Sequence, residues 1–213
     1  MDVKRVAIAG GTGLVGGHLL AQLCTLPAVK QVFAVGRRAP AQSNAKLKFI
    51  ECALDSAPDL PAIDTAFCCL GTTIRKAGSQ AAFRAVDLDM VVHFARAAKK
   101  AGATHFGLVS ALGANAKSGV FYNRVKGEAE AALMALGFES LTLVRPSLLL
   151  GERDESRPAE RFGIAVSRVL SPLMIGPARR VRPVDAEAVA RTLLHSAQTH
   201  DQGIHVVESE QIT

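Results

Sequence analysis

The residues whose types and spacing most plainly suggest chemistry stand in the segment FYNRVKGEAEAAL, residues 121–133, which holds the only tyrosine of this 213-residue chain. Lys126 follows Tyr122 by four positions, so in a helix the two side chains share one face, one turn apart. A phenol can act as a general acid, and a nearby ammonium favours its phenolate form. The same spacing also fits an amphipathic helix in which the Tyr122 ring only packs on a neighbour.

A glycine-rich segment, GGTGLVG, directly follows the first apolar run and precedes a helix-like pattern. Gly10, Gly13 and Gly16 have the spacing G-x-x-G-x-x-G, overlapped by Gly11. Such glycines permit a tight strand-to-helix turn and let the backbone approach a pyrophosphate at the helix N-terminus. This context favours a dinucleotide site over a purely structural turn. The expected cofactor contacts in this turn are Gly10, Gly11, Thr12, Gly13, Leu14, Val15 and Gly16.

The end of the second apolar run, FAVGRR, bears on the type of dinucleotide. An acidic residue at this point would bind the ribose 2'-hydroxyl of NAD, whereas arginine accepts the 2'-phosphate of NADP. Arg37 and Arg38 stand here, and no Asp or Glu occurs between Asp2 and Glu51. We therefore expect NADP(H) in preference to NAD(H), the alternative being that both arginines are solvated loop residues.

Short apolar runs alternate with longer amphipathic ones along the chain. The runs RVAIAG, QVFAVG, LKFIEC, TAFCCLG, HFGLVSA and LTLVRP indicate strands, with helical patterns between several of them. This order predicts an α/β fold with a doubly wound parallel sheet that is covered on both faces. A helix DAEAVARTLLHSAQ, with Asp185 as its N-cap, and a strand GIHVVE are expected near the end of the chain.

Composition limits the classes of function. The length and the 49% hydrophobic content fit one large domain. A formal net charge of +6 can indicate nucleic acid, a membrane surface or an anionic ligand, but one tyrosine, no tryptophan and no basic run longer than two disfavour nucleic acid. The four cysteines form no zinc pattern, so we expect reduced core thiols and no metal. Without an apolar signal peptide or a long apolar run, the expected location is cytoplasmic, with no membrane association.

Taken in order, these motifs resemble the atypical and extended branch of the short-chain dehydrogenase/reductase superfamily. The similarity is closest to its Tat-interacting oxidoreductase-like NAD(P)-binding proteins, and it spans nearly the whole chain. The segments that carry it are GGTGLVG, VGRR, CCLGTT, KAGATHFGLVSALGA, YNRVKGEAEA, VRPSLLLGERDESRP and VRPVDAEAVA. The resemblance implies a single Rossmann-type domain over residues 1–213, in which residues 151–183 form a substrate-side segment. Within that segment, the pattern AERFGIAVSRVLSPLM predicts a helix.

The resemblance also implies catalytic roles. The superfamily's catalytic serine, tyrosine and lysine fall on Ser110, Tyr122 and Lys126. Tyr122 would deliver a proton to a carbonyl oxygen that receives hydride, and Ser110 would donate a second hydrogen bond to that oxygen. Lys126 would tune Tyr122 and hold the nicotinamide ribose. Ser110 could instead be a strand-end turn former, and Asp87 stands near a position where extended members often carry asparagine.

Further contacts follow from the same resemblance. Leu70, Gly71, Thr72 and Thr73 after the fourth strand, and Pro146 and Ser147 after the sixth, are expected near the cofactor. Leu54 and Asp55 are expected beside the adenine. Arg157 is a candidate contact for an anionic substrate, although its arginine-rich segment also fits a solvated, internally paired surface.

These expectations define two hypotheses. The first is an NADP(H)-dependent oxidoreductase, a monomer or homodimer, that acts on a small carbonyl or alcohol with Tyr122 as general acid and base. The alternative is a non-catalytic NADP(H)-sensing regulatory protein that binds a protein partner. The presence of Ser110, Tyr122 and Lys126 favours the enzyme, because a sensor does not need a proton donor.

Overall fold

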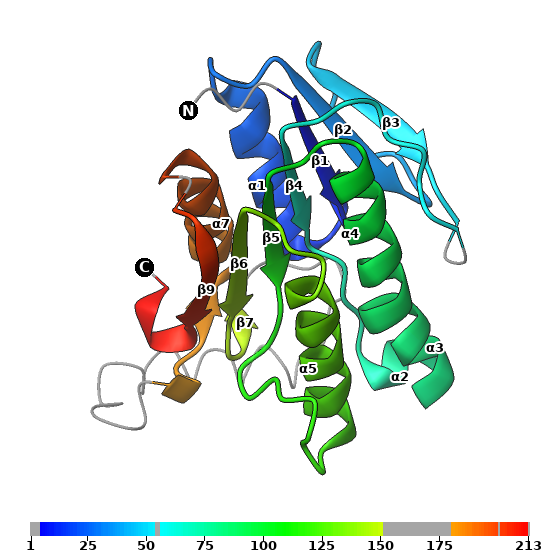
Figure 1. The fold of residues 1–213 in the computed structure, drawn as a ribbon, viewed down its shortest axis with the longest axis vertical. Helices are drawn as coiled ribbons and strands as arrows, with labels where there is room; N and C mark the ends of the chain where they lie inside the picture. The colour runs from blue at the N-terminus through cyan, green and yellow to red at the C-terminus, as the bar shows by residue number, and fades with distance from the viewer. Residues whose placement is uncertain (1–4, 54–55, 151–179, 200, 213) are drawn as a thin grey trace.

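The computed structural model describes residues 5–53, 56–150, 180–199 and 201–212. Its centre is a seven-stranded parallel sheet in the order β3-β2-β1-β4-β5-β6-β9 (Figure 1). The strands are Arg5–Ala9 (β1), Gln31–Gly36 (β2), Leu47–Glu51 (β3), Thr65–Cys68 (β4), His105–Val109 (β5), Ser140–Arg145 (β6) and Gly203–Glu208 (β9). The predicted doubly wound Rossmann fold is confirmed, including each strand expected from an apolar run.

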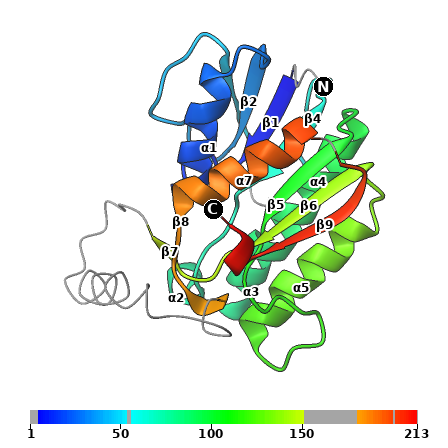
Figure 2. The same ribbon diagram turned by 90° about the vertical axis from the view of Figure 1, so that its left-hand side faces the viewer.

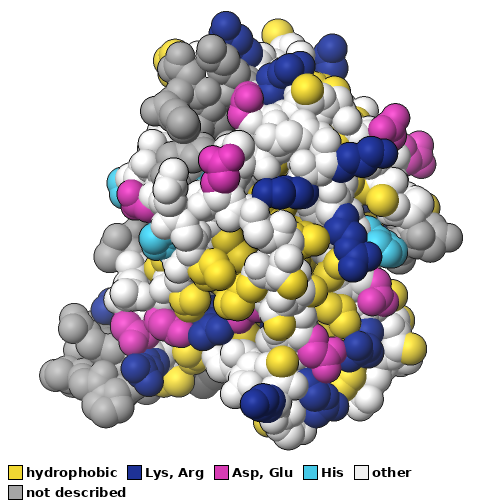
Figure 3. Space-filling view, in the orientation of Figure 1, with side chains coloured by type: hydrophobic (Ala, Val, Ile, Leu, Met, Phe, Trp, Pro, Cys, Tyr) yellow, Lys and Arg dark blue, Asp and Glu magenta, His cyan; other side chains and the backbone are white. Residues whose placement is uncertain are grey.

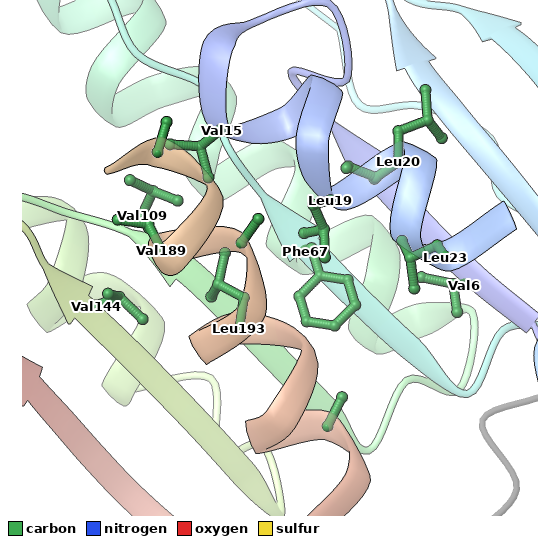
Figure 4. Packing of buried hydrophobic residues seen from close by; sticks show 14 of the residues in the cluster. Val6, Val15, Leu19, Leu20, Leu23, Phe67, Val109, Val144, Val189 and Leu193 are labelled. Carbon is green, nitrogen blue, oxygen red and sulfur yellow. The ribbon is translucent and has the colours of Figure 1, made fainter. Parts of the chain in front are cut away.

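Helices cover both faces of this sheet (Figures 1 and 2). One face carries α1 (Leu14–Thr25) and α7 (Ala186–Thr199), and the other carries α4 (Met90–Lys100) and α5 (Phe121–Met134). Each face has its own apolar cluster. In the first cluster, Phe67 of β4 lies close to Leu19 of α1 and Leu193 of α7 (Figure 4). Because both faces are covered, the central strands β1, β4 and β5 are buried along almost their whole length.

The helical segment between β4 and β5 departs from the prediction. Between the runs that form β4 and β5, the sequence has one long amphipathic pattern, QAAFRAVDLDMVVHFARAAKKAG, which predicts a single helix. The structure instead has α3 (Gln80–Arg84), a π-helical turn η1 (Ala85–Asp89) and then α4. A short α2 (Ile74–Ala77), capped by the side chain of Thr73, precedes them. A π turn holds more residues than a regular helical turn, so it changes the direction of the side chains within it. Asp87 is the buried residue of η1.

The C-terminal part adds features that the sequence did not predict. Leu149–Leu150 (β7) and Val184–Asp185 (β8) form a small parallel pair, and a 3-10 turn, Ser209–Gln211 (η4), follows β9. Asp185, which we expected to cap the last helix, ends β8 directly before α7. The expected helix at residues 159–174 and most of the segment 151–183 lie outside the described residues.

The surface and the cysteines can be compared with the composition. All four cysteines are free thiols, as expected. On the face shown in Figure 3, basic and acidic side chains are interspersed around a central apolar patch, and the positive charge does not form a continuous stripe. None of the helices in the described ranges has the length and apolar character needed to cross a membrane.

Candidate functional site

The predicted site residues lie where the parallel strands end. In a doubly wound sheet, ligands bind outside the carboxyl ends of the strands, at the point where the strand order reverses. Here that point lies between β1 and β4, which are neighbours in the sheet. The residues that follow the strand ends are Gly10–Gly16 after β1, Arg37 and Arg38 after β2, Leu70–Thr73 after β4, Ser110 after β5, and Pro146 and Ser147 after β6. Leu54, Asp55 and Arg157 lie outside the described residues.

The glycine turn after β1 requires glycine at two points. Gly10 has φ +81°, and a Cβ placed there would lie 2.6 Å from the carbonyl carbon of Cys69 at the end of β4. A Cβ at Gly16 would overlap the carbonyl oxygen of Gly10. Since both obstacles are backbone atoms, no side-chain adjustment can relieve them. The two glycines therefore let the turn pass close to β4 and let α1 begin against it.

The first turn of α1 is suited to an anion. Gly13 is the N-cap residue; its N–H donates to the Gly10 carbonyl at 2.9 Å, and its carbonyl accepts from the Gly17 N–H at 2.7 Å. No side chain caps the helix, and no acidic residue stands in its first turn. Thr12 and Gly13 are exposed. The helix N-terminus therefore offers backbone N–H groups and a positive dipole end to a negatively charged group.

The two arginines after β2 lie on the surface, unlike Ser110 and Lys126. Arg37 and Arg38 are both exposed, and in the described part of the chain neither has a carboxylate partner. Their guanidinium groups are therefore available to an anionic group that reaches the end of β2.

A buried ion pair forms the most strongly charged part of the site. Lys126 Nζ of α5 lies 2.7 Å from Asp87 Oδ1 of η1, with the two side chains 6% and 0% exposed. The other carboxylate oxygen of Asp87 accepts a 2.9 Å hydrogen bond from the Thr72 N–H. Burial by itself lowers the pKa of Lys126, but the charges of Asp87 and Tyr122 outweigh it and raise that pKa above its ordinary value. Lys126 is therefore a charged ammonium at neutral pH.

Tyr122 lies one turn before Lys126 on α5 and is partly buried. Its ring packs on Phe83 of α3, with the ring centroids 5.5 Å apart. Ring packing, one of the two interpretations of the sequence, is therefore present. The hydroxyl has no hydrogen-bond partner within the described ranges, so packing accounts for the ring but does not account for the oxygen.

Ser110 follows β5 directly and is 5% exposed. Its N–H donates to the Val144 carbonyl at 2.8 Å, but its hydroxyl has no partner among the described residues. Burial of a polar group without a partner is unfavourable, so such a hydroxyl indicates a ligand atom. Three other buried polar side-chain atoms share this condition outside the ion pair, on Gln22, Thr65 and His93. None of these follows a strand end, since Thr65 begins β4 and the other two lie on α1 and α4.

The residues after β6 already have partners in the protein. The Ser147 hydroxyl donates to the Arg182 carbonyl, and the Ser147 N–H donates to Ser209 Oγ at 3.2 Å. The Pro146 carbonyl accepts a hydrogen bond from the Leu112 N–H. The Pro146 bond holds the loop after β6 beside the loop after β5, and the Ser147 bonds hold it to the segments before β8 and after β9.

Sequence reasoning missed one residue that positions α5. A Cβ at Gly127 would overlap backbone atoms of Asn115 and Ala116, so the helix that carries Tyr122 lies directly against the loop after β5. The Asn115 N–H also donates to the Asn123 carbonyl at 2.9 Å. A glycine in the interior of a helix lowers its stability, so it usually marks a close contact with another segment. The glycine in the helical pattern KGEAEA was therefore a signal in the sequence for this contact.

Comparison with known proteins agrees with this fold. No family model matches the chain. It is 38% identical over 203 residues to "Protein fmp52, mitochondrial" of Emericella nidulans, covering 88% of this chain and 86% of that protein. It is 40% identical over 167 residues to "Protein HTATIP2" of Rattus norvegicus, covering 75% and 69%. In structure it is similar to the Bordetella bronchiseptica enzyme WbmH in complex with NAD+, with TM-score 0.71, 15% identity, and 97% and 76% coverage.

One expectation is overturned by these relatives. Several fungal proteins similar to this chain are named as mitochondrial, which contradicts the cytoplasmic location inferred from the sequence. That inference tested only for an apolar signal peptide and an apolar span, and a mitochondrial location requires neither.

Proposed function

The chain belongs to the family of the FMP52 and HTATIP2 proteins, atypical members of the short-chain dehydrogenase/reductases, and from this premise we propose that it is an NADP(H)-dependent oxidoreductase. Its substrate would be a small carbonyl or alcohol. The observation that carries the proposal is the buried Ser110 hydroxyl, which has no partner among the described residues, together with Tyr122 and the charged Lys126 on α5.

The site fits a nicotinamide dinucleotide. Gly10 and Gly16 leave the space that a Cβ would fill, and the uncapped N-terminus of α1 lies beside them. These features suit a pyrophosphate, and the lysine of α5 suits a ribose hydroxyl. When bound, the cofactor supplies or accepts the hydride.

The chain's own residues would handle the proton. The Ser110 hydroxyl would donate a hydrogen bond to the substrate oxygen and hold it in place. The Tyr122 hydroxyl would give its proton to that oxygen as negative charge develops on it, and would take the proton back in the oxidative direction. The positive charge of Lys126 would stabilise the phenolate that remains on Tyr122.

The preference for NADP(H) within this proposal rests on Arg37 and Arg38. Both are exposed, and within the described ranges neither has a carboxylate partner, so each can form charge-assisted hydrogen bonds to a 2'-phosphate. We also assign the substrate side to residues 151–183 and infer a mitochondrial location, as the names of the fungal relatives suggest.

Titration with NADPH and with NADH tests the cofactor, and a panel of small aldehydes and ketones, followed by cofactor absorbance, tests turnover. We expect tighter binding of NADPH and consumption of it with at least one carbonyl. Ser110→Ala is the matched variant, which should keep NADPH binding and lose most of the turnover. Failure to bind either dinucleotide would reject the proposal, whereas tight NADPH binding with no turnover on any carbonyl would favour the sensor.

A further inference from the structure

We propose that Asp87 is a positioning residue of this site, whose carboxylate offsets the positive charge that Lys126 presents to the Tyr122 hydroxyl. The inference rests on the proposed function, because it concerns the residue assigned to proton transfer. Its test, however, needs neither cofactor nor substrate.

The contacts of Asp87 join three segments that are distant in sequence. One carboxylate oxygen lies 2.7 Å from Lys126 Nζ on α5, and the other accepts a hydrogen bond from the Thr72 N–H in the loop after β4. Asp87 itself stands on η1 and is 1% exposed. With both oxygens engaged, the carboxylate is held in one place, and it fixes the ammonium of Lys126 in turn.

The π-helical turn is an independent observation in favour of a functional role. Residues 80–100 would otherwise form one regular helix, and the π turn Ala85–Asp89 interrupts it where Asp87 stands. Such turns are rare and occur frequently at functional sites. In η1 the one buried residue is an aspartate, so the irregular turn brings a carboxylate into the interior beside Lys126.

The charge of the pair has a direct consequence for Tyr122. A buried ammonium alone would act strongly on a nearby phenol, because the protein interior screens charge weakly. With a carboxylate 2.7 Å from the ammonium, the two charges largely cancel at the position of a third group. Lys126 therefore supports the phenolate less than an unpaired lysine would.

Other ionisable groups near α5 do not provide this compensation. Burial raises the pKa of Cys68 on β4 to about 12, so this thiol stays neutral when tyrosine titrates. Arg84 of α3 and Glu128 of α5 pair with each other at 2.6 Å, and Arg124 binds the carbonyl of Ser118 at 3.0 Å.

Asp89, the remaining acid of η1, is exposed. Glu130, eight residues after Tyr122 on α5, is buried, but its carboxylate is paired with Arg145 at 2.6 Å. In the described part of the chain, the Asp87–Lys126 pair is therefore the buried charge one helical turn from Tyr122.

The chain itself supplies a selective probe. Tyr122 is its only tyrosine and tryptophan is absent, so the near-ultraviolet absorbance of tyrosinate reports on this one residue. The midpoint of its pH titration can be measured on the cofactor-free protein and on three variants, D87N, K126Q and the double variant D87N/K126Q. E128Q is the matched control, because it removes a carboxylate from α5 without touching Lys126.

The expected order of midpoints follows from the charges. In D87N burial lowers the pKa of Lys126 without an opposing carboxylate, so Lys126 should lose its charge before Tyr122 ionises and the midpoint should match that of the double variant. In K126Q the carboxylate is left alone and the midpoint should rise. The double variant is neutral like the wild-type pair and should stay within about half a unit of wild type. The control E128Q should titrate as wild type does.

A K126Q midpoint equal to that of the double variant would overturn the proposal, because the Asp87 carboxylate would then not act on Tyr122. So would a double variant that titrates more than about one unit above wild type, because Lys126 would then act without compensation. The double variant contains no unpaired buried charge, so it decides the question even if D87N does not fold. Because no turnover is measured, a missing enzyme activity leaves this result unaffected.

Discussion

Two regions near the carboxyl ends of the parallel strands differ in burial. The buried corner, defined as Asp87, Ser110 and Lys126, consists of side chains that are almost fully buried and, in the ion pair, held by short contacts. The arginine turn, defined as Arg37 and Arg38, is exposed and has no carboxylate partner in the described ranges. Each region includes a residue that directly follows a strand, Ser110 after β5 and Arg37 after β2, but only the buried corner is part of the interior.

This difference in burial gives the two regions different capabilities. Charges in the interior interact strongly and are little affected by salt, whereas exposed charges are weakened by both water and ions. The buried corner can therefore hold groups in fixed positions for proton transfer, at the risk of destabilising the fold when it is altered. The arginine turn can select an anionic ligand, and its loss should leave the fold intact.

The largest expected effect comes from breaking the buried pair. Lys126→Met leaves the Asp87 carboxylate buried and unpaired, and loss of one partner of a buried ion pair typically costs about 3–5 kcal/mol of unfolding free energy. Denaturant unfolding measures this loss. The double variant D87N/K126M is the matched control, since it removes both charges. It should recover most of the lost stability, and a double variant no more stable than Lys126→Met would show that the pair is not responsible.

The next largest effect concerns the chemistry of the corner. Tyr122→Phe keeps the ring contact with Phe83 but removes the hydroxyl. Loss of a general acid should reduce turnover by about 10²-fold or more, equivalent to about 2.7 kcal/mol, while NADPH affinity stays nearly unchanged. Steady-state kinetics and a binding titration separate the two. Turnover within a few-fold of wild type would remove Tyr122 from the mechanism and leave only its packing role.

These two regions also show what the sequence could predict. The strands, the glycine turn and the Tyr122–Lys126 pair follow local rules, namely apolar runs of strand length, glycines between a strand and a helix, and a four-residue spacing that places two side chains on one helix face. Arg37 and Arg38 could be placed for the same reason, because they follow a strand end directly.

The missed features depend on contacts between distant segments. The π turn that buries Asp87 follows from the packing of α3, η1 and α4 against the sheet and α5, and no local pattern in FRAVDLDMVV indicates it. The overlap that a Cβ at Gly127 would cause depends on where the loop at Asn115 lies. The β7–β8 pair joins residues more than thirty positions apart, each strand being only two residues long.

A smaller effect is expected at the arginine turn. Replacing Arg37 and Arg38 with alanine should weaken NADPH binding by roughly tenfold or more and leave NADH binding nearly unchanged, because only NADPH carries the 2'-phosphate. The matched control is Arg96→Ala with Lys100→Ala, which removes two exposed charges from α4 away from the strand ends. Titration of each variant with both dinucleotides measures the preference. Equal affinities for the two dinucleotides in the wild-type protein would show the arginine turn to be a solvated loop.

The smallest expected effect is the response to salt, and it compares the two regions in one protein without mutation. Raising the ionic strength from about 0.1 M to about 1 M shortens the Debye length from about 10 Å to about 3 Å. The preference for NADPH over NADH should then shrink by a few-fold, because the exposed arginines are screened. The tyrosinate midpoint of Tyr122 should hardly move, because the Asp87–Lys126 pair beside it is buried. A salt-independent NADPH preference would mean that the 2'-phosphate is bound by buried groups, and a midpoint that shifts strongly with salt would mean that the corner is open to solvent ions.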